Sequence, residues 1–170
     1  NDKKDKKYKD AYFNHFNNIW HHGDFAEIKK TKGFIIHGRS DTTLNPGGVR
    51  LGTAEIYSEV EKFKEIKESI VVGQSWDNDV RIILFIIMNE KFILTEDLLK
   101  KIKIQIKKNA SPRHVPSKVI EVKDIPRTKS GKIVELAVKN IIEGNNIKNK
   151  EALANPQALE QFKNLRELNI

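Results

Sequence analysis

The sequence predicts an α+β fold in which helices flank a small mixed β-sheet. Two long runs rich in β-branched residues, 66–76 and 79–88, are separated by a turn at 77–78 and predict a hairpin. A helical pattern, a third short strand at 118–122 and a second helical pattern follow in that order. The order strand–strand–helix–strand–helix after residue 41 is typical of one small domain, which fits a chain of 170 residues.

The first forty residues predict a smaller unit in front of this domain. Apolar and aromatic residues recur at helical spacing over 11–20, which predicts a helix. Two short strands, 25–28 and 33–37, follow and are joined by a lysine-rich turn. The polar break at 38–41 separates this unit from the rest, and we expect the domain boundary there.

The segment between this boundary and the hairpin predicts a tight reversal followed by a helix. Asn-Pro-Gly-Gly at 45–48 supplies turn residues at consecutive positions. Thr53 predicts the N-cap of a helix whose apolar face includes Ile56 and Phe63.

Further along the chain, capping and breaking residues delimit three more helices. Thr95 predicts the N-cap of a helix that the proline-containing run 111–116 ends. Gly144 predicts the end of a later helix. Asn155, followed by proline, predicts the N-cap of a last helix. The apolar stripes of these helices are Leu98, Leu99, Ile102 and Ile106; Leu136, Val138, Ile141 and Ile142; and Leu159, Phe162 and Leu165.

Composition restricts the partners and the compartment. The chain has 31 basic and 23 acidic residues, a formal net charge of +8, which favours anionic partners such as nucleotides and coenzymes. It has no cysteine, so disulfides and thiolate chemistry are excluded and a reducing, cytoplasmic compartment is expected. The longest apolar run, 82–88, is far too short to span a bilayer, and we expect no membrane partner. The five histidines show no metal-ligand spacing, and we expect no metal site.

The most informative stretch is the basic loop at 125–134, Ile-Pro-Arg-Thr-Lys-Ser-Gly-Lys-Ile-Val. Pro126 and Gly131 break regular structure, so the cations near them lie on a loop and not on a helix face. Such a loop can hold a lysine toward an anion while its backbone N–H groups stay available to donate. A phosphate-binding P-loop needs glycine at the position of Pro126, which excludes that motif. Taken alone, the loop is also compatible with a solvated basic turn. Its three cations are Arg127, Lys129 and Lys132.

Four short motifs occur along the chain in a fixed order. Trp-x-x-Gly-Asp ends at Asp24, and Gly-Arg-x-Asp-x-x-Leu-x-x-x-Gly-x-Arg-x-Gly-x-x-Glu runs unbroken over 38–55. Ser-Pro-Arg follows at 111–113, and Pro-x-Thr-x-Ser-Gly-Lys ends at Lys132. Together these motifs resemble the adenylate-forming enzymes, the family of acyl-CoA synthetases, adenylation domains and luciferases. The resemblance extends over residues 20–143.

The tail of the chain narrows this resemblance. Val-Glu-Leu-Ala-Val-Lys-Asn-Ile-Ile-Glu-Gly at 134–144 and Asn-Lys-Glu-Ala-Leu-Ala-Asn-Pro at 149–156 are similar to the acetoacetyl-CoA synthetase branch of the family. Arg-His-Val-Pro at 113–116 agrees with that branch. The alternative within the family is another short- or medium-chain acyl-CoA synthetase.

The resemblance implies a two-step ligase with a mobile C-terminal lid. Acetoacetate would attack the α-phosphorus of ATP, with Mg²⁺ present, to give an acyl-adenylate and pyrophosphate, and coenzyme A would then displace AMP. Residues 1–40 would end the large N-terminal domain, residue 41 would be the hinge, and 42–170 would form the lid. The lid's expected partner is the rest of that large domain, which supplies the phosphate loop, the acid pocket and the bulk of the ATP and Mg²⁺ site. Because those parts are absent from this sequence, we expect the isolated chain to be inactive.

The resemblance also assigns roles to residues that match the family's motifs. Lys132 corresponds to the adenylation lysine, whose ammonium offsets charge as the carboxylate meets the phosphate. Asp24 corresponds to the aspartate that accepts hydrogen bonds from both ribose hydroxyls, and Arg39 to an arginine near the ribose and phosphate. Asp41 corresponds to the hinge residue, which absorbs the backbone change when the lid swings. The competing interpretation is ordinary turn chemistry for Asp24 and Asp41, and a solvated surface cation for Lys132.

A passage for coenzyme A is implied in the same way. Gly48 corresponds to the position that the pantetheine passes, where only a residue without a side chain leaves room. Arg50 would support the reversal or contact coenzyme phosphates, and Arg113 would contact the nucleotide end of coenzyme A. Turn chemistry is the competing interpretation for Gly48, and surface solvation explains Arg113 equally well.

Two functions from other classes stay open on the sequence alone. The charge and the basic loops suit a nucleic-acid-binding module. Against it, aromatic residues make up only 8% of the chain and no helix carries a basic stripe with base-reading residues, so we expect no nucleic-acid partner. The other alternative is a stand-alone regulatory lid that binds coenzyme A or a partner without catalysis.

Overall fold

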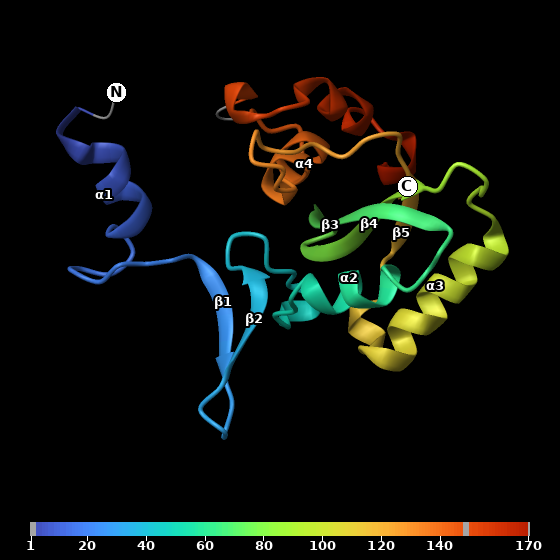
Figure 1. Ribbon diagram of the computed structural model, residues 1–170, viewed down its shortest axis with the longest axis horizontal. Coiled ribbons are helices and arrows are strands. Elements are labelled where there is room, and N and C mark those ends of the chain that lie inside the picture. The colour runs from blue at the N-terminus through green and yellow to red at the C-terminus, as the bar shows by residue number, and fades with distance from the viewer. Residues whose placement is uncertain (1–2, 148–149, 170) are drawn as a thin grey trace.

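The structure is a computed structural model that describes residues 3–147 and 150–169 (Figure 1). Residues 1, 2 and 149, which the sequence assigned to the N-terminal unit and to the tail motif, lie outside the described residues. The α-helices are α1 Lys6–Tyr12, α2 Ala54–Val60, α3 Glu96–Asn109 and α4 Glu135–Ile142. The strands are β1 Asp24–Ile28, β2 Phe34–Arg39, β3 Ile66–Trp76, β4 Asp79–Met88 and β5 Lys118–Glu121. Short 3₁₀ helices are η1 Lys3–Asp5, η2 Pro46–Gly48, η3 Pro112–His114, η4 Lys150–Ala152, η5 Pro156–Phe162 and η6 Arg166–Leu168.

A three-stranded mixed sheet forms the centre of the molecule, in the order β3-β4-β5. β3 and β4 pair antiparallel, and β5 joins β4 in parallel, because α3 carries the chain back between them. Asp77 and Asn78 form the hairpin turn with φ values of 49° and 58°, the left-handed geometry that a two-residue hairpin needs. The predicted α+β class, the mixed sheet and the hairpin are confirmed.

Both faces of this sheet are covered, so its strands are buried on both sides. Val71 and Leu84 face the cluster formed with α2 and α3. Ile70 and Phe85 face the opposite cluster, which includes Val138 of α4 and residues of the C-terminal tail. Figure 1 shows this arrangement: α2 and α3 lie below the sheet, and α4 and the tail lie above it.

Several elements begin or end where local sequence signals predict it. The Thr95 hydroxyl accepts a hydrogen bond from the Leu98 amide at 3.2 Å, which caps α3. Gly144 follows α4 with a φ of +72°, the left-handed conformation that ends helices. Thr53 directly precedes α2, but its hydroxyl makes no cap hydrogen bond, and α2 ends at Val60, before Phe63.

The N-terminal segment differs from its predicted form. Helix α1 spans Lys6–Tyr12, and the predicted helix over 11–20 is wrong, because the chain bends after Tyr12 and Asn18 adopts a left-handed φ of 59°. No residue of α1 is buried, so its apolar stripe has no surface to pack against. The aromatic rings pack locally instead, with Tyr12 and Trp20 5.6 Å apart between ring centroids.

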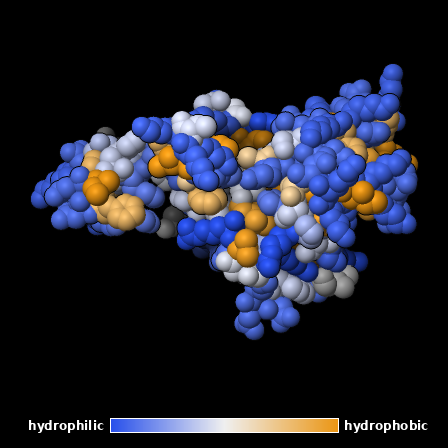
Figure 2. All heavy atoms as spheres, turned by 90° about the horizontal axis from the view of Figure 1, so that it is seen from below, coloured by the Kyte–Doolittle hydropathy of each residue, from blue (hydrophilic) through white to orange (hydrophobic). Residues whose placement is uncertain are grey.

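The hairpin formed by β1 and β2 extends from the main body, as Figure 1 shows. Ile28 and Phe34 at its tip are 69% and 68% exposed. Among the described residues, no hydrophobic side chain before Leu44 is buried. Apolar side chains are visible at the left of Figure 2, on the side of this N-terminal segment. No helix in the described part of the chain is long and apolar enough to cross a bilayer.

Candidate functional site

The lysine loop, residues 126–133, is a closed turn fixed by its own backbone. The Thr128 amide donates to the Lys132 carbonyl at 2.8 Å, and the Lys132 amide donates back to the Thr128 hydroxyl at 3.1 Å. Gly131 bonds to the Thr128 carbonyl at 2.8 Å and has a φ of +83°, which a side chain would strain. Arg127 and Ile133 pair as an antiparallel bridge at the base. The local geometry therefore follows from the Thr-x-Ser-Gly-Lys pattern.

The hydrogen bonds of this turn use the backbone of Lys132 and not its side chain. Its side chain is exposed, and within residues 3–147 and 150–169 the ammonium makes no hydrogen bond or ion pair. The backbone of the residue is thus fixed while the charged end of the side chain is available to an external anion. This combination is suited to a lysine that enters and leaves a reaction centre on another body.

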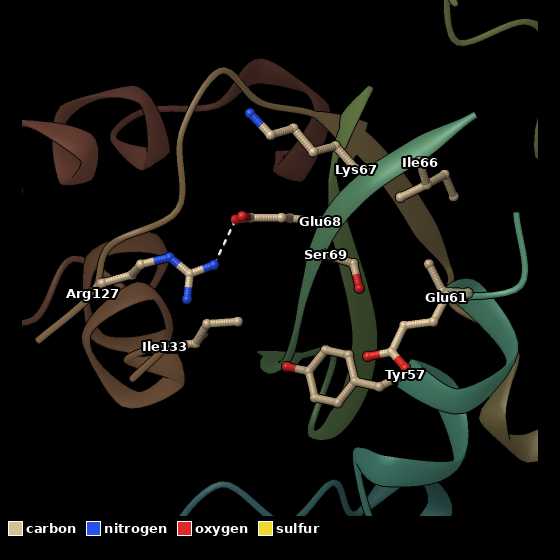
Figure 3. A pocket seen from close by; sticks show the side chains of 9 residues that line it. Tyr57, Glu61, Ile66, Lys67, Glu68, Ser69, Arg127 and Ile133 are labelled. Carbon is tan, nitrogen blue, oxygen red and sulfur yellow. Dashed lines mark hydrogen bonds and ion pairs between the residues drawn. The ribbon is translucent and has the colours of Figure 1, made fainter. Parts of the chain in front are cut away.

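A cavity of about 280 Å³ lies beside the loop, between α2, β3 and Ile133 (Figure 3). Arg127 reaches across it, and its Nη2 pairs with Glu68 Oε2 at 2.6 Å. The Tyr57 phenol at its edge donates to Glu135 and accepts from the Val71 amide at 3.0 Å. Burial, with the nearby Glu135 carboxylate, raises the pKa of Tyr57, so the phenol stays protonated as a donor.

Three of the predicted site residues come together where β1 pairs with the end of β2. Arg39 Nε and Nη2 each donate to the Asp41 carboxylate at 3.3 Å, and Arg39 Nη1 lies 3.8 Å from Asp24 Oδ1. Asp24 also pairs with His22 Nδ1 at 2.6 Å. The hydrogen bond to Asp41 raises the pKa of Arg39. This cluster offers a carboxylate and a guanidinium side by side, a pair suited to a ribose hydroxyl pair and a phosphate.

A second group contains Gly48 and Arg113. The reversal at 45–48 is fixed by the Gly47 amide, which donates to both Asp79 carboxylate oxygens at 2.9 and 3.0 Å. Hydrogen bonds from the Val80 amide and then from the Gly47 amide lower the pKa of Asp79. Gly48 has a φ of +75°, and nothing lies within 4 Å of the point where its Cβ would be. Arg113 borders this reversal, because its Nη1 would lie 3.1 Å from a Cβ on Gly47. Arg50 is exposed and makes no hydrogen bond or ion pair within the described chain.

One contact joins the two sides of the predicted hinge. His37 of β2 bonds to Glu55 in the first turn of α2, at 2.8 Å between Nδ1 and Oε1. The Gly52 backbone passes close to β2, since a Cβ there would lie 2.5 Å from the His37 carbonyl oxygen. The segments on either side of residue 41 thus touch directly in this arrangement.

Three contacts near the candidate site could not be predicted from the sequence. The sequence assigned Asn155 to a helix cap, but η5 receives no side-chain cap, and the Asn155 amide bonds to the lysine loop instead. It showed Arg127 only as a loop cation, without its partner Glu68, and it indicated no role for His37. Each contact joins residues at least 18 positions apart, so no local pattern could have revealed it.

The fold and the lysine loop define a class of protein. Residues 55–132 match the family described as AMP-binding enzyme C-terminal domain. Residues 55–132 therefore form an AMP-binding enzyme C-terminal domain, as the motifs of the chain predicted.

Within that class the chain is similar to acetoacetyl-CoA synthetases. It is 58% identical over 168 residues to acetoacetyl-coenzyme A synthetase of Rhizobium meliloti (strain 1021), covering 99% of this chain and 26% of that protein. It is 48% identical over 170 residues to acetoacetyl-CoA synthetase of Xenopus tropicalis, covering 99% of this chain and 25% of that protein. The chain therefore spans about a quarter of the length of these curated relatives.

Solved structures agree with this assignment. The acetoacetyl-CoA synthetase from Streptomyces lividans superposes with a TM-score of 0.89 at 37% identity, over 100% of this chain and 26% of that one. A benzoate CoA ligase from Burkholderia xenovorans LB400 superposes with a TM-score of 0.66 at 21% identity, over 80% of this chain and 27% of that one, which supports the fold alone.

Proposed function

We propose that this chain is the C-terminal part of an ATP-dependent acetoacetate–CoA ligase and supplies its adenylation lysine. The observation that carries the proposal is Lys132, an exposed and unpaired ammonium on a rigid loop of the described chain. The similarity to acetoacetyl-CoA synthetases over 99% of the chain supports the choice of acid.

In the first step the obstacle is charge, because a carboxylate must approach the triphosphate of ATP. Lys132 would lie against the carboxylate and the bridging oxygen, where its ammonium offsets the charge that builds up. Asp24 would accept hydrogen bonds from the ribose hydroxyls, and Arg39 would lie near the phosphate. Both would first have to exchange their present partners, His22 and Asp41, for the nucleotide.

The second step would use the other group of residues. Gly48 would leave room for the pantetheine, as the open space at its Cβ position allows. Arg50 and Arg113 would pair with phosphates of coenzyme A. The lid would swing about Asp41 between the two steps, which requires the contact between His37 and Glu55 to open.

Mg²⁺ would act on the triphosphate from the large domain. The described residues contain no group of three or more His, Asp or Glu side chains arranged to hold a metal ion. When bound, Mg²⁺ would neutralise phosphate charge alongside Lys132.

The partner of the lid would be the large N-terminal domain of the same protein, with residues 1–40 as its last piece and 42–170 as the lid. The exposed apolar side chains of the N-terminal segment support this, because such side chains are normally covered in a complete protein. We propose that the enzyme works in the reducing cytoplasm that its cysteine-free sequence predicts.

Two half-reactions test the proposal. The isolated chain is expected to show no pyrophosphate exchange with ATP and acetoacetate, whereas the full-length enzyme should show it. In the full-length enzyme, Lys132→Ala should lower this exchange by at least about 100-fold and leave thioester formation from supplied acetoacetyl-adenylate within about twofold.

Lys129→Ala is the matched control, since it removes an exposed ammonium three residues away on the same loop. We expect it to change neither half-reaction by more than about twofold. Equal losses for Lys129→Ala and Lys132→Ala, or clear turnover by the isolated chain, would count against the proposal.

A further inference from the structure

We propose that the C-terminal tail, residues 150–168, braces the lysine loop, and that Asn155 is the positioning residue that sets the loop for adenylation. The inference rests on the proposed function, because it gives the tail a role in presenting Lys132. The tail lies beyond residues 55–132, the part that matches the family, so the family's shared domain does not include it.

The tail lies along the loop and is joined to it by one β-bridge and two further backbone hydrogen bonds. Thr128 and Leu153 form an antiparallel bridge. The Ala154 amide donates to the Arg127 carbonyl at 2.8 Å, and the Lys129 amide donates to the Ala152 carbonyl at 3.2 Å. Residues 127–129 of the loop are thus bonded to the tail on one side and to residues 131–133 of the loop on the other side.

A single side chain, that of Asn155, holds the start of the same loop segment, 127–129. Its Oδ1 accepts from the Arg127 amide at 2.8 Å. Its Nδ2 donates to Asp124 Oδ2 at 2.8 Å and to the Ile125 carbonyl at 3.0 Å. The Asn155 amide therefore bonds to Asp124, Ile125 and Arg127, where the chain enters the loop, and none of these bonds caps the helix that follows Asn155.

The brace is itself anchored to the sheet. Phe162 is fully buried and meets Phe85 of β4 edge to face, with ring centroids 4.9 Å apart. Gln161 accepts from the Lys123 amide at 2.7 Å and donates to the Asp124 carbonyl at 2.6 Å. Because the tail is tied to the core on both sides of Asp124, it can transmit the rigidity of the sheet to the loop.

Arg127 holds the loop from the opposite side. Its Nη1 donates to the Gly131 carbonyl at 2.9 Å, directly before Lys132, and its Nη2 pairs with Glu68 of β3 (Figure 3). The loop backbone is thus held by the tail on one side and by β3 on the other, while the Lys132 ammonium stays unpaired among the described residues. A catalytic cation placed in this way needs little reordering before reaction, and a displacement of about 1 Å can cost about 100-fold in rate.

The test uses Asn155→Ala in the full-length enzyme and follows both half-reactions. We expect acetoacetate-dependent pyrophosphate exchange to fall by about 10- to 100-fold. Thioester formation from supplied acetoacetyl-adenylate should stay within about twofold, because that step does not use Lys132. Amide hydrogen exchange at Lys129 and Lys132 should become about tenfold faster, which reports loosening of the loop itself.

Gln157→Ala is the matched control, since it removes an exposed side-chain amide two residues along the same tail that makes no hydrogen bond within the described chain. It should leave both half-reactions and the hydrogen exchange of the loop unchanged. If Asn155→Ala does not fold, Asn155→Asp takes its place: it keeps the acceptor to Arg127, loses the donor to Asp124 and Ile125, and should give the same selective loss.

Equal losses in the two half-reactions would show that Asn155 only stabilises the fold. Unchanged pyrophosphate exchange with a loosened loop would show that the placement of Lys132 by the loop does not limit adenylation. Either result overturns the inference. Failure of the proposed function would look different, since the unaltered enzyme would then show no acetoacetate-dependent exchange. In that case unchanged hydrogen exchange at Lys129 and Lys132 in Asn155→Ala would by itself refute the brace.

Discussion

At the scale of single residues, the proposed sites depend on which side chains already have partners within the chain. Asp24, Arg39 and Asp41 bond mainly to one another and to His22, so their present partners compete with a nucleotide. Lys132 and Arg50 have no such competition among the residues that the structure describes. In the first step Asp24 and Arg39 would thus have to exchange partners, whereas Lys132 is already available, as Arg50 is for the second step.

Gly48 provides a residue-scale prediction. Gly48→Leu in the full-length enzyme should reduce thioester formation by about 100-fold, because the side chain would occupy the space where the pantetheine passes. Adenylation should be little affected. Stopped-flow measurement of each half-reaction with supplied acetoacetyl-adenylate or with ATP would separate the two effects.

Gly144→Leu is the control for backbone strain. Gly144 has a φ of +72° against +75° for Gly48, and neither has an atom within 4 Å of its Cβ position. Both substitutions should therefore cost about 1 kcal/mol or more of stability from the left-handed conformation alone. If Gly144→Leu lowered thioester formation as much as Gly48→Leu does, the passage at Gly48 would be ruled out.

At the scale of elements, local chemistry decided some structures and distant contacts decided others. The turn at Asp77 and Asn78, the Thr95 cap and the stop at Gly144 each need only their own neighbours, and the sequence predicted all three. Asn155 carries an equally good local signal, Asn followed by Pro. A helix, η5, does begin at Pro156 as this signal predicts, but the Asn155 side chain bonds to the Arg127 amide, 28 residues away, and does not cap that helix.

The same distinction between local and distant contacts explains which residues of the candidate site could be predicted from the sequence. Lys132 and Gly48 were found because their motifs are contiguous in sequence. Arg127 could not be given its role, because Glu68 lies 59 residues before it and only the folded sheet brings the two together. The helix expected over 11–20 is wrong for a related reason, since its apolar residues Phe16, Ile19 and Trp20 are exposed and no tertiary packing supports a helix there.

The tail provides the element-scale prediction. Phe162→Ala in this chain should lower the free energy of unfolding by about 3–5 kcal/mol, because it empties a fully buried site against Phe85. Urea unfolding followed by circular dichroism measures the change. Phe16→Ala is the control, since Phe16 is 53% exposed and its loss should stay within about 0.5 kcal/mol. Similar losses for the two variants would mean that the tail does not belong to the core.

At the scale of the whole molecule, the described residues before Leu44 add no buried hydrophobic side chain to the core around the sheet. Limited trypsin digestion of the chain should cut first at the lysines of the β1–β2 turn, 29–32, which are exposed. The remaining fragment should keep the sheet domain intact, since the contact between His37 and Glu55 is partly exposed and contributes at most about 1 kcal/mol.

Mass spectrometry of the digest and thermal unfolding of the fragment check this prediction. A stable fragment that starts within residues 30–33 and unfolds cooperatively supports the proposed boundary at residue 41, because the sheet domain then folds without the segment before the cut. Loss of cooperative unfolding after the cut would mean that the first forty residues and the sheet form a single folding unit.

The covering of the sheet by the C-terminal tail has a consequence for synthesis. Ile70, Phe85 and their neighbours lie on a face that Phe162 and Leu168 help to close, so this face stays open on the ribosome until those late residues have emerged. The nascent protein therefore displays an apolar sheet surface for tens of residues of translation, a natural substrate for chaperones. The lysine loop would reach its working shape only after that interval, which makes the maturation of the enzyme a late event in the life of each molecule.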